Sequence, residues 1–444
     1  MKKVVFSFIK AAVMFPVKYF FFLLSMFGLP FISYSQMPAS ASNLVYVLEP
    51  DRVFDGERMH TGWWVVVKGN RIVAAGDSAQ MQVPEQATII ALRGMTLLPG
   101  FIEGHGHLFL HPYNETPWDD QVLRESLAER VARAVVHARA TLMAGFTTER
   151  DLGTEGADDA DVGLKQAIEK GVIPGPRILC ATRAIVATGS YAPRGFRPDW
   201  PVPQGAQEAS GIDGIMLAVR QQIKQGADVI KIYADYRWGP NGENEPTFTI
   251  EELKAAVEVA HSSGRIVAVH TVTPEGMRRA ILAGVNTIEH GDYGTPELFR
   301  MMKERGIALC PTIAAVEAIA GYQGWRKGHD PDPPRVAAKK KSFRAALNAG
   351  VTICMGGDVG VFPHGDNARE MEDMVAYGMS PLDVLRSATS VNADVFHIAD
   401  RVGRIRPGLL ADLVAVKGNP AEHIQDIRQV QLVMKDGIIY RKPQ

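Results

Sequence analysis

Two histidines separated by one glycine are the residues of this chain best suited to bind a metal ion. They end the segment PGFIEGHGH, residues 99–107, which follows the apolar run Met95–Leu98. In an extended strand His105 and His107 point to the same face, because side chains alternate between faces. The glycines before and between them let another group approach the backbone closely. Two neutral imidazoles at one strand end form half of a typical metal site, so the remaining ligands must come from elsewhere in the chain.

Four further apolar, strand-like runs carry a residue that can bind a metal or exchange a proton. One of these residues, Lys231, is unusual, since burial disfavours its charged form and a protonated amine cannot bind a cation. Alternation puts Tyr233 on the same face as Lys231, where its hydroxyl is suited to donate a hydrogen bond to a developing oxyanion. A tyrosine that only lines the interior is the alternative interpretation. The four residues are Lys231 in DVIKIY, His270 in VAVH, His290 in TIEH and Asp358 in MGGD.

Eight short apolar runs must position these residues, and helical patterns lie between most of them. Several helical patterns close on glycine just before the next run, as at Gly226 and Gly350, which is typical of a helix C-cap. This order favours an α/β fold, specifically a (β/α)8 barrel over residues 99–402, in which chemistry gathers at the carboxyl ends of the strands. The runs are 97–104, 146–152, 177–185, 228–234, 265–272, 286–290, 307–313 and 351–357.

The regions on either side of this alternation are rich in short alternating strands. Gly69-Asn70 lies between two such runs and is typical of a two-residue hairpin. We expect residues 44–98 and 403–444 to form one small β-sandwich domain built from both ends of the chain.

The N-terminal 35 residues have the pattern of a secretory signal. Lysines precede a short apolar stretch, and small residues before Gln36 suggest cleavage after Ser35. The protein is therefore expected to be periplasmic or secreted. The alternative is an uncleaved segment, which would be the only contact with a membrane.

The overall charge argues against one class of partner. The formal net charge is −1 and the pI is about 6.9. Because nucleic-acid binding depends on basic surfaces, we expect a small-molecule substrate and no nucleic acid.

The motifs, taken together, resemble the amidohydrolase superfamily. They lie between about residues 44 and 440 in the family's order: PGFIEGHGH, GFTTERDLG, KIY, VAVH, NTIEH, GGDVG, SATSVNA and GRIRPGLLADLVAV. The similarity is to the branch of metal-dependent dipeptidases that includes Xaa-Pro dipeptidases and imidazolonepropionase-like proteins, some of which hydrolyse amide-linked mycotoxins. It implies a (β/α)8 barrel, a β-sandwich, two divalent metal ions that are usually Zn²⁺, and a homo-oligomer in many relatives.

The resemblance also implies a role for the buried lysine. Carboxylation of Lys231 by CO₂ to N6-carboxylysine would turn the amine into an anionic ligand that bridges the two ions. The other implied ligands are His105, His107 and Asp358 for the first ion, and His270 and His290 for the second.

These features predict an exported binuclear amidohydrolase that cleaves dipeptides or N-acyl amino acids by a metal-bridging hydroxide. Asp358 is suited to take the proton of the water and deliver it to the leaving amine. The chain departs from many relatives at Thr188–Gly195, where they carry Gly-Gly-His-Gly, and at Val272, where they carry histidine. Substrate contacts are expected from four residues in loops after the strands, namely Tyr191, Arg194, Arg237 and His364.

Two alternatives remain open from the sequence. The same metal site would serve a hydrolase of a cyclic amide, lactone or phosphoester. A surface-anchored binding protein without catalysis would keep the fold, but it would be expected to have lost one or more of the ligands.

Overall fold

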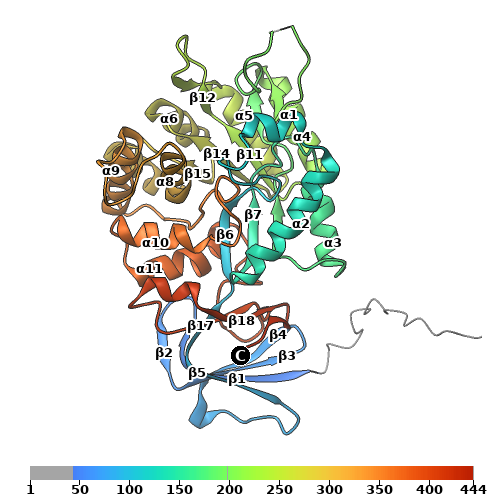
Figure 1. Ribbon diagram of the computed structural model, residues 1–444, viewed down its shortest axis with the longest axis vertical. Helices are drawn as coiled ribbons and strands as arrows, with labels where there is room; N and C mark the ends of the chain where they lie inside the picture. Colours follow the sequence, from blue (N-terminus) through green and yellow to red (C-terminus); the bar gives the residue numbers. More distant parts are fainter. Residues whose placement is uncertain (1–43, 198, 444) are drawn as a thin grey trace, which may run out of the picture. The chain divides into compact units, whose positions relative to one another are not determined.

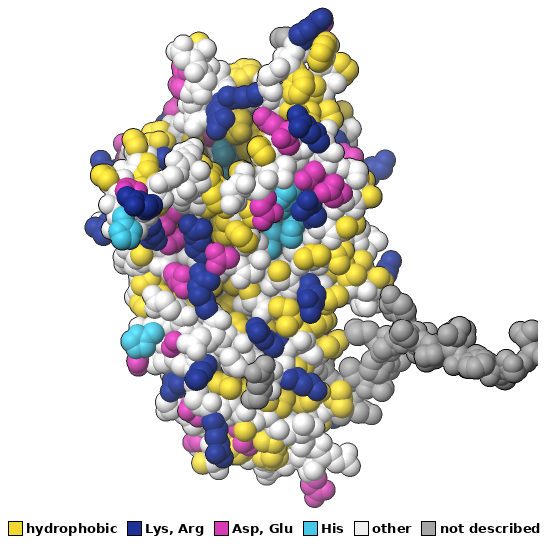
Figure 2. All heavy atoms as spheres, viewed as in Figure 1, with side chains coloured by type: hydrophobic (Ala, Val, Ile, Leu, Met, Phe, Trp, Pro, Cys, Tyr) yellow, Lys and Arg dark blue, Asp and Glu magenta, His cyan; other side chains and the backbone are white. Residues whose placement is uncertain are grey.

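The computed structural model describes residues 44–197 and 199–443, in which parallel strands and helices alternate between antiparallel strands at both ends (Figure 1). The predicted signal segment, residues 1–35, lies outside the described residues, so the segment, its cleavage and the localisation stay predictions. Within the described part of the chain, no helix has the length and apolarity needed to span a membrane. On the face drawn in Figure 2, Lys and Arg side chains are interspersed with Asp and Glu.

One eight-stranded sheet combines strands from both ends of the described chain. Its order is β19-β18-β17-β5-β1-β3-β4, with β2 paired to β1. The predicted hairpin joins β3 to β4, with Lys68 opposite Arg71. The β-sandwich and its domain boundaries stay predictions. The strands are β1 (Val45–Phe54), β2 (Met59–Thr61), β3 (Trp63–Lys68), β4 (Arg71–Asp77), β5 (Thr88–Pro99), β17 (Leu413–Lys417), β18 (Val430–Lys435) and β19 (Ile438–Arg441).

The middle of the chain forms two parallel sheets. The first has the order β6-β7-β8 and the second β10-β9-β11-β14-β15-β16. A short antiparallel pair, β12 (Asp235–Arg237) and β13 (Asn244–Pro246), follows β11. The parallel strands are β6 (Phe101–Gly106), β7 (Phe146–Asp151), β8 (Arg177–Cys180), β9 (Ile185–Ala187), β10 (Gln207–Ala209), β11 (Val229–Tyr233), β14 (Ile266–Thr271), β15 (Thr287–His290) and β16 (Ala308–Cys310).

The eighth expected strand is reduced to isolated contacts. In the run 351–357, Ile353 makes a parallel bridge to Leu309, and just beyond the run Val359 bridges Gly106. Gly356 and Gly357 interrupt this run, and glycine weakens a strand interior. The described strands therefore do not form one continuous eight-stranded sheet, although these bridges connect β16 and β6 through the segment that carries Asp358.

The prediction of one strand across residues 97–104 is wrong, because the chain changes sheets at Gly100. Leu98 pairs with Val414 in the terminal sheet, whereas Phe101 opposite Phe146 begins the parallel sheet. A Cβ at Gly100 would lie 2.2 Å from Oγ1 of Thr147, so the crossing requires glycine. This change of sheet lets β6 begin immediately before the two histidines.

Helices lie between most of the parallel strands, and α8 is buried over most of its length. The C-cap glycines Gly226, Gly284 and Gly350 adopt φ of 110°, 85° and 70°, as the sequence pattern indicated. The helices are α1 (Trp118–Arg124), α2 (Leu127–Met143), α3 (Ala160–Glu169), α4 (Gly211–Gln225), α5 (Ile250–Ser262), α6 (Pro274–Ala283), α7 (Pro296–Glu304), α8 (Ile313–Tyr322), α9 (Pro334–Ala349), α10 (Ala368–Ala376), α11 (Pro381–Arg386) and α12 (Asn392–Val395).

Candidate active site

A cavity of about 360 Å³ lies at the carboxyl ends of the parallel strands. Five of the six predicted metal ligands line it, together with a group of tyrosines and two arginines, Arg237 and Arg335. The sixth, Lys231, is 1% exposed and lies next to the cavity, with Nζ 3.3 Å from Nε2 of His105. The five lining ligands are His105, His107, His270, His290 and Asp358.

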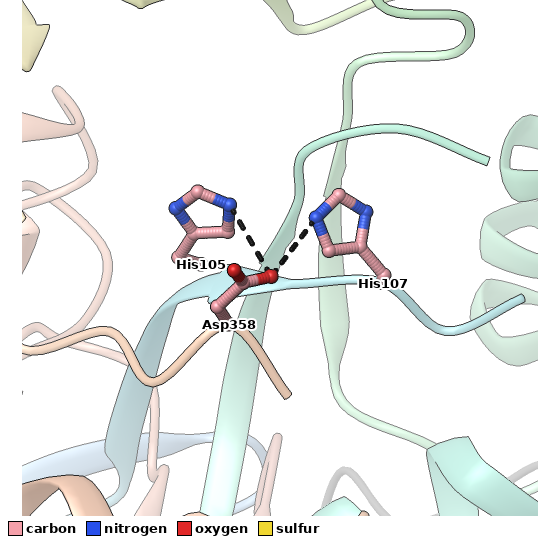
Figure 3. A group of neighbouring side chains, drawn as sticks. All are labelled: His105, His107 and Asp358. Carbon is pink, nitrogen blue, oxygen red and sulfur yellow. Dashed lines mark ion pairs between the residues drawn. The ribbon is translucent and has the colours of Figure 1, made fainter. Parts of the chain in front are cut away.

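The first predicted ion site is a tight cluster of three donor atoms (Figure 3). Oδ1 of Asp358 lies 3.3 Å from Nε2 of His107 and 3.7 Å from Nε2 of His105. The three ligand atoms lie within 4.8 Å of one another. Two imidazole nitrogens and one carboxylate oxygen directed at one point suit a divalent ion such as Zn²⁺. The residues present therefore fit the metal that the family resemblance implies.

Both imidazoles are oriented by hydrogen bonds on the side away from this cluster. Nδ1 of His107 lies 2.8 Å from the carbonyl oxygen of Gly153, so this nitrogen is the donor and Nε2 is directed at Asp358. Nδ1 of His105 lies 2.8 Å from Oε2 of Glu289, whose other oxygen accepts from Nη2 of Arg150 at 2.9 Å. Partners of this kind fix the ring orientation of metal-binding histidines.

The electrostatics of the cluster keep an acid ionised beside a neutral histidine. Burial lowers the pKa of His105 to about 4, and Lys231 acts in the same direction. Burial raises the pKa of Asp358, but the neighbouring His105 and His107 outweigh it and hold this pKa below its ordinary value. A neutral imidazole and an ionised carboxylate are the forms that bind metals.

The second predicted pair, His270 and His290, lies beside the first. The ring centroid of His290 is 5.1 Å from that of His105 and 4.4 Å from that of His270. Nδ1 of His290 contacts Oγ1 of Thr312 at 2.7 Å, while His270 stacks on Tyr233 with centroids 4.4 Å apart. The structure thus gathers four histidines around one end of the cavity.

The surroundings of Lys231 favour the neutral form of its amine. Burial lowers the pKa of its amine, and within the described residues it forms no ion pair with a carboxylate. Because only a neutral amine can add CO₂, the surroundings favour the reactive form.

Backbone strain is concentrated at this end of the strands. His290 and Asp358 adopt φ of 72° and 62°, and the residues Glu155 and Thr312 adopt φ of 50°. Non-glycine residues rarely occupy this region, and such strain gathers at functional sites.

The four predicted substrate residues divide into two pairs. Tyr191 and Arg237 line the cavity, whereas Arg194 is exposed and does not line it. His364 also lies outside the lining, with Nε2 3.1 Å from the carbonyl oxygen of Leu110 and its ring stacked on His137. The structure therefore does not bring Arg194 and His364 into the cavity.

Sequence reasoning did not identify several residues that complete the site. Arg150 and Glu289 form a buried ion pair behind His105, and Glu155 places a carboxylate in the cavity. Arg150 and Glu289 had one signal in the sequence, a charged residue within the strand-like segments GFTTERDLG and NTIEH, whereas Glu155 had none. Arg335 was also not identified from the sequence, and its Nε donates to Asp292 at 2.7 Å at the cavity edge.

The chain belongs to the amidohydrolase family, whose model matches residues 96–439. This confirms the resemblance drawn from the motifs and makes the protein a hydrolase that acts on C–N bonds.

Its relatives include an enzyme and solved structures of matching length. The chain is 30% identical to ochratoxinase from Aspergillus niger over 424 residues, covering 88% of this chain and 85% of that protein. A crystal structure of a Xaa-Pro dipeptidase with methionine bound in its active site superposes with a TM-score of 0.80 and 34% identity, covering 89% of this chain and 100% of the other. A prolidase complexed with N-methylphosphonate-L-proline gives a TM-score of 0.77 and 30% identity over 90% of this chain and all of that one.

Proposed function

We propose that this protein is an exported, binuclear metal-dependent amidohydrolase that cleaves the amide bond of dipeptides or N-acyl amino acids. The observation that carries the proposal is the convergence of His105, His107 and Asp358 on one point of a cavity. The relatives named as a dipeptidase, a prolidase and an ochratoxinase support an amide substrate.

Zn²⁺ is the metal we propose for the pair of sites. Imidazole and carboxylate ligands suit zinc, and N6-carboxylysine at Lys231 would supply the anionic oxygen between the ions. The proximity of Lys231 Nζ to His105 Nε2, 3.3 Å, supports this assignment. We also infer that the two parallel sheets belong to a (β/α)8 barrel, because the bridges from Leu309 and Gly106 reach the segment between them.

The residues around the metal site have separable roles in this reaction. Divalent ions there would lower the pKa of a bound water and polarise the scissile carbonyl. Asp358 is ionised and lines the cavity, so it can accept a proton from the attacking water and pass it to the leaving amine. The hydroxyl of Tyr233 lies on the same strand face as Lys231 and can donate to the developing oxyanion.

Arg237 is the residue that we propose for binding the substrate carboxylate. It lines the cavity and, within the described part of the chain, makes no ion pair with a carboxylate. Arg335, in contrast, is already paired with Asp292. A guanidinium can bind a carboxylate through two parallel hydrogen bonds.

A substrate panel tests this function. The purified enzyme should hydrolyse dipeptides and N-acyl amino acids and should lose most of this activity on their C-terminal amides. Arg237→Gln should raise KM for the substrates with a free carboxylate. It should also reduce the difference in activity between these substrates and their C-terminal amides. Turnover of cyclic amides, lactones or phosphoesters, with none of linear amides, would contradict the proposal. Binding of dipeptides without turnover would indicate the non-catalytic alternative.

Export is proposed from the N-terminal pattern alone. Sequencing the mature protein tests it, with Gln36 expected as the first residue. An intact N-terminus on the cell-associated protein would instead support an uncleaved anchor.

A further inference from the structure

Glu155 is a buried carboxylate at the cavity that lacks a cationic side-chain partner among the described residues. It lies just after β7, is 2% exposed and lines the cavity. Arg130 contacts this residue only at the backbone, where Nη1 donates to the carbonyl oxygen at 2.7 Å. The side-chain carboxyl group therefore reaches the cavity with no salt bridge from the described residues.

Three neutral donors hold this carboxylate in place. Nε1 of Trp118 and the hydroxyl of Tyr191 donate to Oε2 at 2.9 and 2.5 Å, and the hydroxyl of Tyr233 donates to Oε1 at 3.2 Å. A carboxylate offers about four acceptor positions, so Oε1 can accept a further donor. A buried anion with neutral partners only is costly, and a cation that enters the cavity would relieve that cost.

Tyrosine rings surround the same point of the cavity. The ring centroid of Tyr191 lies 5.0 Å from that of Tyr233 and 4.8 Å from that of Tyr236, and all three residues line the cavity. Aromatic faces attract cations, most strongly where water is excluded. A carboxylate enclosed by tyrosines is therefore matched to an organic ammonium group.

Tyr233 indicates how close an ammonium group bound at Glu155 would lie to the metal site. Its hydroxyl reaches Glu155, while its ring stacks on His270 in the metal site. Tyr233 thus contacts both Glu155 and the metal site, so the two lie close together. In a dipeptide, one carbon separates the α-ammonium from the scissile carbonyl, so the two groups must also be bound close together.

We propose that Glu155, with Tyr191 and Tyr236, binds the free α-ammonium of a dipeptide, and that the enzyme prefers dipeptides to N-acyl amino acids. This inference rests on the proposed amide hydrolysis and narrows its substrate class. Glu155 acts as a specificity residue, because it pairs with a charge that the N-acyl compounds lack.

Isosteric substrate pairs test the proposal. Each pair consists of Ala-Xaa and isobutyryl-Xaa, in which a methyl group replaces the ammonium, for Xaa of Leu, Met, Phe, Pro and Arg. For the best pair, we expect the wild type to favour the dipeptide in kcat/KM by at least about 10-fold. Glu155→Gln should lower kcat/KM for the dipeptide by at least about 30-fold, as expected for losing one partner of a buried charge pair, and change the isobutyryl compound by less than about 3-fold.

Three further variants separate recognition of the ammonium group from positioning of the site. Glu258→Gln, an exposed residue within α5, is the matched control and should change neither substrate. Tyr191→Phe keeps the charge of Glu155 and should keep the preference for the dipeptide. Calorimetry with the Asp358→Asn variant measures the affinity for both compounds of a substrate pair. Adding Glu155→Gln to this variant should weaken binding of the dipeptide and leave binding of the isobutyryl compound unchanged.

The outcomes distinguish the inference from the function on which it rests. Hydrolysis of the isobutyryl series at equal or higher rate, or an equal loss of both series in Glu155→Gln, would overturn the ammonium site and leave the amidohydrolase function standing. Hydrolysis of neither series, together with turnover of lactones or cyclic amides, would overturn both.

Discussion

Nε2 of His107 lies 3.3 Å from Oδ1 of Asp358, and this contact joins the residue that follows the first parallel strand, β6, to the segment between α9 and α10. His105 approaches the same oxygen at 3.7 Å (Figure 3). The contact depends on close packing of two backbones, since Gly104 N donates to the carbonyl oxygen of Met355 at 3.0 Å and Asp358 N to that of His105 at 2.8 Å.

Gly104→Ala should therefore disturb both stability and metal binding. A Cβ at this position would lie 2.4 Å from the backbone oxygen of Met355, which cannot rotate away. We expect a loss of about 1–3 kcal/mol in the free energy of unfolding, measured by urea denaturation, and weaker retention of metal on dialysis. Gly163→Ala, in α3 with no atom within 4 Å of the new Cβ, is the control and should stabilise the protein by about 0.5–1 kcal/mol. Unchanged metal retention in Gly104→Ala would contradict the close-packing argument.

Lys231→Ala should abolish the metal pair rather than only slow turnover. The substitution removes the only protein group proposed to bridge both ions. Metal analysis after dialysis should show fewer than two ions per chain, and hydrolysis should be lost. Lys254→Ala, on the exposed face of α5, is the control that should retain both properties. Two retained ions and a wild-type rate in Lys231→Ala would refute the bridging role.

Glu289→Gln should weaken both metal binding and stability, because Glu289 supports His105 and Arg150. The carboxylate neutralises Arg150, which is fully buried, and accepts from Nδ1 of His105. Loss of the charge leaves the guanidinium buried without a counter-ion, so we expect about 3–5 kcal/mol of destabilisation. Metal affinity should fall by about 10- to 100-fold, as for other residues that orient a ligand histidine. Denaturation and metal titration measure the two effects, with Glu258→Gln as the control; wild-type values for both would exclude this supporting role.

The ligand residues could be predicted because each one departs from its surroundings in an apolar run. Lys231, His270 and Asp358 stand out against valines, isoleucines and glycines, and strand alternation places them. Arg194 and Arg237 carried the same loop signal, and only the tertiary structure separates the arginine that lines the cavity from the one that does not.

Glu155 could not be predicted from local patterns. Glu155 depends on φ of 50° and on donors from three distant segments, none of which has a periodic signal. At Gly100 the predicted domain boundary between residues 98 and 99, beside the chain-breaking pair Pro99-Gly100, lies next to the observed change of sheet, and only the expectation of one strand over residues 97–104 missed it.

Tyr233→Phe should lower kcat more than it changes KM. The hydroxyl donates to Glu155 in the free protein and is proposed to donate to the oxyanion in the transition state. Removal of one such donor typically costs about 10²- to 10³-fold in kcat. Steady-state kinetics measure the change, with Tyr46→Phe in β1 as the control. A change confined to KM would assign Tyr233 to substrate binding alone.

Asp292 should contribute to stability only above acid pH. Burial raises its pKa, but Lys339 and Arg335 outweigh this and lower it to about 2, below the ordinary value of 3.8. The folded state therefore binds fewer protons than the unfolded state between these values, and stability is lost as pH falls through them. Asp292→Asn should be destabilised by about 3–5 kcal/mol at neutral pH, because Lys339 is left buried and unpaired. Urea denaturation between pH 7 and 2 should show this difference shrinking below pH 4; a constant difference would contradict the pairing.

The central claim is that His105, His107, Lys231, His270, His290 and Asp358 hold two metal ions that drive amide hydrolysis. The most direct measurement is the metal content of the purified mature protein, made together with amino-acid release from dipeptides. We predict about two zinc ions per chain, release of free amino acid, and loss of both after chelation with recovery on adding zinc. A protein that releases amino acids without bound metal, or that binds two ions without cleaving any amide, would contradict the account.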